Sequence, residues 1–164
     1  MNIELDRLFN PPLKGLSDGI SIVHYIAQCK GNSSGVLAIV KQTLQVAIQL
    51  SDKEIFDERT WIERLPDQFI KNSAPHPSPE EIDREAKLSL EERIQLQEEG
   101  KCSVRMFMNS FRPELELKKW TWWDAEILDE NHIAVAVEVE DFLFPWQGLR
   151  WLFKGAIELE PKYP

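Results

Sequence analysis

The stretch WTWWDAEILDENHIAVAVEVED, residues Trp120–Asp141, decides the fold class of this chain. It holds three of the six tryptophans, followed by seven carboxylates, with no Lys or Arg among them. Tryptophan, isoleucine and valine are enriched in strands, and the polar run Asp129–Asn131 between the two apolar halves favours a turn. The stretch therefore predicts a β-hairpin with strands over 117–128 and 132–141.

The register of this hairpin determines which tryptophans are buried. A two-residue turn at Glu130 and Asn131 would place Trp123 opposite Glu138, which puts a carboxylate into a dry core. A three-residue loop, with Asn131 in the left-handed conformation that Asn tolerates, pairs Trp123 with Val137 instead. We expect the second register, in which Trp123 and the valine row form the core face.

The opposite face of the hairpin is then the candidate partner-binding site. Its four carboxylates would be buried only at a cost of several kcal/mol each unless paired, so we expect this face to meet water. Exposed tryptophans rimmed by carboxylates are typical of surfaces that bind a basic protein. The alternative is that a short helix at 145–154 covers the tryptophans of this face. The site residues are Trp120, Trp122, Asp124, Glu126, Glu138 and Glu140.

Local patterns predict the elements on either side of the hairpin. Residues 31–52 repeat apolar side chains at helical spacing, with Ser33 or Ser34 as the cap of a helix, and Pro145 favours the first turn of the helix at 145–154. Residues 18–30 fit either a helix or a buried strand, and we favour the helix. Alternation of side chains over 101–111 predicts a further strand.

Helical patterns thus precede strand patterns along the chain, an order typical of α+β proteins. We expect N-terminal helices, over about 1–100, packed on a C-terminal antiparallel β-meander, over about 101–160, with one short helix near the C-terminus. A chain of 164 residues forms a single domain by default, here 1–164, and can bury enough surface to fold without a metal or a disulfide.

Residues 78–99 predict an acidic helix on the surface. The proline-rich run SAPHPSP before it favours an extended linker. Ser78 with Glu81, and Ser89 with Glu92, match two capping boxes, and the second box marks a break in the helix. Its apolar residues form one thin stripe, so most of the helix surface is expected to stay in water.

The net charge of −9 lies mostly in two segments, 51–100 with fourteen acids and seven bases, and 114–141 with nine acids and two bases. Phosphate backbones require Lys and Arg surfaces, so we expect no nucleic-acid partner. No apolar run approaches the roughly 18 residues of a membrane span, and the N-terminus lacks the apolar core of a secretory signal. The widely spaced Cys29 and Cys102 indicate reduced thiols and a cytoplasmic location.

No catalytic constellation stands out in the sequence. The histidines His24, His76 and His132 are scattered and match no zinc-ligand spacing, so we expect no metal and no cofactor. We expect His24 to be packed, and the other two to lie at the surface. The alternative to a binding protein is a small-molecule-binding or enzymatic domain with a pocket between the helices and the sheet.

The run DFLFPWQGLRWLFKGA, residues 141–156, follows an alternating acidic strand. With its FP-x-x-GL-x-WL pattern, it resembles the C-terminal part of small bacterial immunity proteins, over about the last 45 residues of the chain. The resemblance carries no catalytic residue across. It implies an intracellular, non-enzymatic protein that neutralises a cognate toxin, often a basic nuclease, by binding it.

Overall fold

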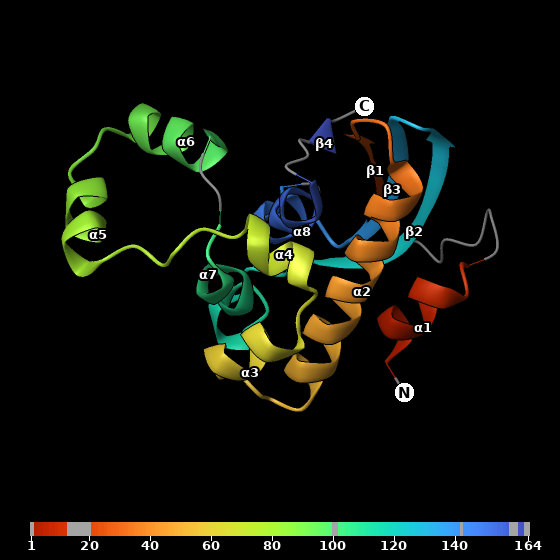
Figure 1. Ribbon diagram of the computed structural model, residues 1–164, viewed down its shortest axis with the longest axis horizontal. Helices are drawn as coiled ribbons and strands as arrows, with labels where there is room; N and C mark the ends of the chain where they lie inside the picture. The colour runs from red at the N-terminus through yellow and green to blue at the C-terminus, as the bar shows by residue number, and fades with distance from the viewer. Residues whose placement is uncertain (1, 13–20, 100–101, 142, 158–160, 163–164) are drawn as a thin grey trace.

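The computed structural model describes residues 2–12, 21–99, 102–141, 143–157 and 161–162 (Figure 1). Its strands form an antiparallel sheet in the order β2-β3-β1-β4. The strands are β1 (Ser21–Gln28), β2 (Trp120–Asp129), β3 (His132–Val139) and β4 (Pro161–Lys162). The helices are α1 (Ile3–Phe9), α2 (Ser33–Asp52), α3 (Glu58–Arg64), α4 (Asp67–Asn72), α5 (Pro79–Ala86), α6 (Leu90–Glu99), α7 (Val104–Asn109), the short 3₁₀ helix η1 (Pro113–Leu115) and α8 (Gln147–Ile157). The expected α+β class, with a short helix near the C-terminus, is confirmed.

The first correction concerns residues 18–30, for which a helix was expected. Residues 21–28 form strand β1, so this expectation is wrong. Residues 18–20 lie outside the described part. β1 pairs with β3 along its whole length, from Ser21 opposite Val139 to Gln28 opposite His132. Pairing with β1 provides hydrogen-bond partners for the backbone groups on the second edge of β3. These long-range hydrogen bonds favour the strand, although the local sequence pattern fits a helix equally well. His24 faces away from the core and is exposed, so the expectation that it is packed is also wrong.

The second correction concerns the strand expected over 101–111, where the structure has helix α7. Ser103 caps this helix, because its Oγ accepts a hydrogen bond of 3.1 Å from the amide of Met106. The buried residues Val104, Phe107 and Met108 repeat at helical spacing, and the apolar residues that suggested alternation also fit this period.

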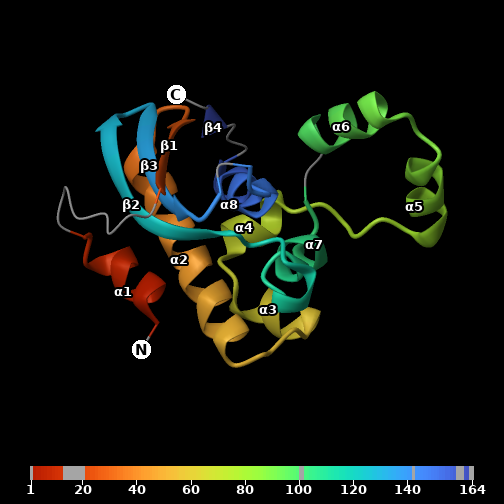
Figure 2. The ribbon, with the colours of Figure 1, turned by 180° about the vertical axis from the view of Figure 1, so that it is seen from behind.

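The core lies on one face of the sheet. The side chains Ile133, Val135, Val137 and Val139 of β3 are buried there, together with Tyr25 and Ala27 of β1. Helix α2 crosses this face and packs against α8 (Figures 1 and 2). Aromatic rings extend the core towards α3, α4 and α7, with Phe69 and Phe107 only 4.7 Å apart between ring centroids. The alternative expectation of a small-molecule pocket between the helices and the sheet stays a prediction.

Candidate protein-binding surfaces

A β-bulge at Trp123 sets the faces of the hairpin. Over Asp124–Ile127 the expected register is confirmed, since Ile127 lies opposite Ile133 and Ala125 opposite Val135. The expected three-residue loop is wrong, because Asp129 pairs with His132 and leaves Glu130 and Asn131 as a two-residue turn in which Asn131 is not left-handed. At Trp123 the pairing shifts by one residue, so that Trp122, not Trp123, lies opposite Val137. An extra residue in one strand reverses the faces of all side chains beyond it. The expected pairing of Trp123 with Val137 is therefore wrong.

The bulge places Trp120 and Trp122 in the core, and the prediction that they form an exposed face is wrong. Trp120 is 2 % exposed and Trp122 is fully buried. Helix α8 covers them, because the ring of Trp122 stacks on Phe153, and Gly148 lies close to the indole of Trp120. The alternative that a C-terminal helix covers these tryptophans is thus the correct one.

The four carboxylates of the predicted site do not form one cluster. Asp124 and Glu126 lie opposite Ala136 and Ala134 on the outer face of the sheet. Glu138 lies opposite Thr121, and its carboxylate accepts a hydrogen bond of 2.7 Å from Arg7 of α1. Glu140 is exposed just beyond the end of β3.

Helix α1 contributes residues that the sequence did not single out. The guanidinium of Arg7 lies 4.5 Å from the ring centroid of Trp123 while it pairs with Glu138. Glu4 is buried, and its carboxylate accepts hydrogen bonds from Nζ of Lys118 and from the amide of Trp122. The partners of Arg7 and Glu4 lie more than a hundred residues away in the chain, so no local sequence pattern could have indicated them.

A second surface is formed by α5, α6 and the short connection between them, residues 79–99, which we call the arm. The chain leaves the body at Ala74 and returns at Ser103, where these two residues form a parallel β-bridge. The amide of Ala74 donates a hydrogen bond of 3.0 Å to the carbonyl of Cys102. His76 Nδ1 also lies 3.1 Å from Ser103 Oγ, so the base of the arm is tied together at two points. Both views show α5 displaced from the sheet and from α2 (Figures 1 and 2).

The arm is held in its helical form mainly by its own caps. The amide of Glu81 donates to Ser78 Oγ, the amide of Glu92 donates to Ser89 Oγ, and the amide of Ser89 donates to the Glu92 carboxylate. The capping residues expected from the sequence and the break before Leu90 are therefore confirmed. No residue of α5 is buried. Helices this short are marginal in water without tertiary packing.

Large apolar side chains of the arm are open to solvent. Leu90 is 71 % exposed, and Ile82, Ile94 and Leu96 are each more than 40 % exposed. The arm also carries eight acids against three bases. The arm therefore presents apolar groups among an excess of carboxylates, a combination that the predicted tryptophan face was expected to supply.

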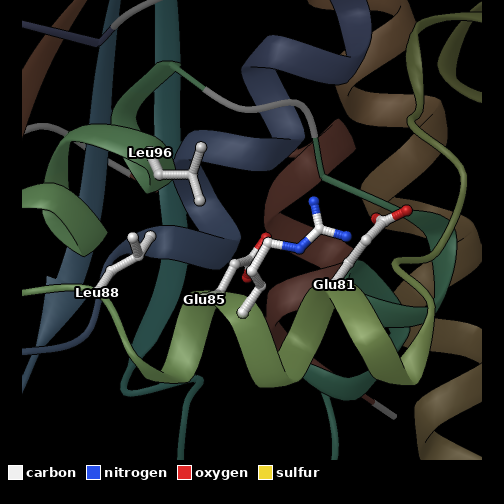
Figure 3. A pocket seen from close by; sticks show the side chains of 5 residues that line it. Glu81, Glu85, Leu88 and Leu96 are labelled. Carbon is white, nitrogen blue, oxygen red and sulfur yellow. The ribbon is translucent and has the colours of Figure 1, made fainter.

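A pocket of about 210 Å³ opens beside α5 and α6 (Figure 3). Its lining residues are Glu81, Arg84, Glu85, Leu88 and Leu96. Leucine side chains beside glutamate carboxylates suit a long basic side chain, whose stem is apolar and whose head is charged.

Neither thiol lies on the outer face of the sheet or on the arm. Cys29 and Cys102 are free and buried, and burial raises the pKa of the Cys102 thiol to about 12. His132 Nδ1 lies 2.8 Å from Asp129 beside the hairpin turn. Within the described residues, no group of three or more His, Cys, Asp or Glu side chains is placed to hold a metal ion.

Comparison with known proteins gave no family model that matches the chain, and no match among curated proteins or solved structures. In the described part of the chain, no helix has both the length and the apolar character needed to cross a membrane.

Proposed function

We propose that this chain is a cytoplasmic, non-enzymatic inhibitor of the immunity type, which neutralises a basic protein toxin by binding it through the arm. The observation that carries the proposal is the exposure of Leu90 and Ile94 on an acidic helical arm that the body does not cover. Apolar anchors inside a charged rim are the usual anatomy of a protein-binding surface. The excess of carboxylates would accelerate the encounter with a basic partner and disfavour nucleic acid.

The connection of the arm to the body supports this role. The bridge between Ala74 and Ser103 closes the arm at its base, so the arm can pack on a partner while the core keeps its own contacts. Two short helices that lack a packing surface would gain that surface from the partner. The free thiols and the resemblance of residues 141–156 to immunity proteins support the assignment of a cytoplasmic inhibitor.

Removal of the arm tests the proposal directly. Because Ala74 and Ser103 are adjacent, residues 78–100 can be replaced by a short Gly-Ser linker with little strain on the body. We expect the shortened chain to fold, and to lose the basic protein that the intact chain retains from cells of its source. The proposal fails if both chains retain the same proteins, or if the retained protein is not basic.

Point variants separate the contribution of the exposed apolar side chains of the arm from that of its negative charge. With the retained partner in hand, the double variant L90S/I94S should weaken binding at least about tenfold, or about 1.4 kcal/mol. The matched control is Leu143→Ser, which removes an apolar side chain that is 92 % exposed outside the arm. Glu80→Lys with Glu91→Lys should weaken binding chiefly at low salt, whereas Glu54→Lys with Glu114→Lys makes the same charge change elsewhere. Equal losses from the arm variants and their controls would refute a role for the arm.

A further inference from the structure

In the described part of the chain, side chains close the outer edge of β2 along its first half only. In the described sheet, β2 is the first strand in the order and has β3 as its neighbour on one side. On the other side, Lys118 Nζ donates a hydrogen bond of 2.9 Å to the carbonyl of Trp120, and the Trp122 amide donates one of 2.8 Å to Glu4. The Glu4–Lys118 ion pair thus takes the place that a neighbouring strand would occupy.

The cover provided by Glu4 and Lys118 does not extend beyond the bulge. The amide of Ala125 donates to the carboxylate of Asp124, so it points away from β3. In an antiparallel ladder the groups that point outward recur at every second residue. The carbonyl of Ala125 and both backbone groups of Ile127 therefore lie on the outer edge. Within the described residues, no hydrogen bond to these three groups is present.

We propose that the edge Ala125–Leu128 is a strand-addition site for an extended segment of a partner protein in which basic and apolar residues alternate. An added strand would form a hydrogen-bonded pair with Ile127, and the residue at that position would share the face of Ile127. Ile127 and Leu128 are 44 % and 52 % exposed, which provides the apolar contact.

Charge determines the rest of the partner sequence. β2 and its turn carry the carboxylates Asp124, Glu126, Asp129 and Glu130, with no Lys or Arg between Trp120 and Asn131. Opposite charges across strands stabilise a sheet and like charges destabilise it. A residue opposite Glu126 should therefore be Lys or Arg, and its neighbours in the added strand should be apolar.

The same charges disfavour a second copy of this chain at this edge. Pairing of β2 with β2 would bring two sets of four carboxylates together in one ladder. The Glu4–Lys118 pair also limits the added strand to the end of β2 near the turn. The site does not involve the arm, so it stands or falls independently of the proposed function.

Three short peptides that alternate lysine with valine test the backbone geometry. The first is the unmethylated parent, the second is N-methylated at its valine amides, and the third is N-methylated at its lysine amides. When valine lies opposite Ile127, its N–H faces β2 and the lysine N–H groups face away. We expect the parent peptide and the lysine-methylated peptide to bind, and the valine-methylated peptide to bind at least about tenfold more weakly. Equal affinities of the two methylated peptides would overturn the proposal.

Variants of the protein give an independent readout. Ile127→Pro removes an N–H that points outward, and an edge strand tolerates proline at such a position. It should abolish binding of the lysine–valine peptide, whereas Ile127→Val, which keeps the N–H and most of the apolar contact, should bind at least about tenfold more tightly than the proline variant. Glu126→Gln should weaken binding severalfold, and Glu91→Gln on the arm should not. The protein without its arm should bind the peptide as well as wild type, so failure here and failure of the proposed function remain distinguishable.

Amide hydrogen exchange identifies what occupies the edge. The Ile127 amide should exchange freely in the monomeric protein and become protected when the lysine–valine peptide is added. Protection in the free monomer would mean that another part of this chain covers the edge, and protection that rises with protein concentration would mean that a second copy does. Either result would overturn the proposal.

Discussion

Nζ of Lys118 and a carboxylate oxygen of Glu4 lie 2.8 Å apart, although 114 residues separate them in the chain. Their side chains are only 19 % and 9 % exposed, so the pair is largely removed from water. The pair also binds one amide and one carbonyl of β2, which fixes α1 beside the edge of the sheet.

Breaking this pair should destabilise the protein. Glu4→Ala removes the charge and the acceptor for the Trp122 amide, and we expect it to lower the free energy of unfolding by about 3 kcal/mol. Glu4→Gln keeps an acceptor and should cost less. Urea denaturation checks both values, and a double-mutant cycle with Lys118→Met measures the coupling between the two side chains. A change below about 0.5 kcal/mol for Glu4→Ala would show that the pair contributes little.

The bulge predicts unequal roles for two adjacent tryptophans. Trp122 is fully buried against Phe153, so Trp122→Ala should cost about 4 kcal/mol of stability. Trp123 is partly exposed under Arg7, so Trp123→Ala should cost about 1 kcal/mol, mainly through the lost cation–π contact. Chemical denaturation of both variants tests the order. The opposite order would support the unbulged register.

The hairpin turn should make stability depend on acid pH. The amide of Asn131, and then His132, donate hydrogen bonds to Asp129 and hold the pKa of its carboxyl below the ordinary value of 3.8. The charged form is thus favoured in the folded state. Its contribution is present above pH 3.8 and is lost as the pH falls through the lower folded pKa. Asp129→Asn should reduce the loss of stability in this range, whereas Glu130→Gln, the same charge change in the same turn, should leave it unchanged. Unfolding curves across this range measure the difference.

Both thiols should resist modification in the folded protein. Burial raises the pKa of Cys102 to about 12, and burial, followed by the charge of Asp129, raises the pKa of Cys29. The reactive thiolate is therefore scarce at about pH 8, and access is blocked as well. A thiol reagent such as DTNB should react slowly with the native protein and rapidly in denaturant. The variant Ser34→Cys, at an exposed position, provides the positive control. Native thiols that react as fast as Cys at position 34 would contradict the prediction.

The parts of the fold that the sequence predicts are those set by local chemistry. Helix α2, the capped arm and the pairing of the hairpin over Asp124–Ile127 follow from periodicity, capping residues and the alternation of strand residues. The cap of α2 is Asn32, one residue before the serines that the sequence suggested. The predictions for the segments that form β1 and α7 were wrong because the apolar residues of each segment fit both a helical and a strand period. Packing of β1 against β3, and of α7 against the aromatic core, decides between the two periods. Local patterns cannot supply that information.

The candidate surfaces also differ in how well the sequence predicts them. The acidic, exposed arm follows from composition and capping, whereas the predicted tryptophan face depended on an uninterrupted register. A single bulge at Trp123 reverses the faces of Trp120 and Trp122. The bulge lets both tryptophans join the valine row beneath α8, a gain that involves residues such as Phe153, far along the chain. No signal within β2 itself marks the extra residue.

The bridge between Ala74 and Ser103 marks the boundary between the folded body and the arm. Residues that stabilise the body lie before and after it, while the segment enclosed between them contributes little to the core. In the proposed role of the arm, substitutions, insertions or exchange of that segment would change what the molecule binds with little loss of folding stability. The proposed binding surface and the folded body could then vary independently of one another.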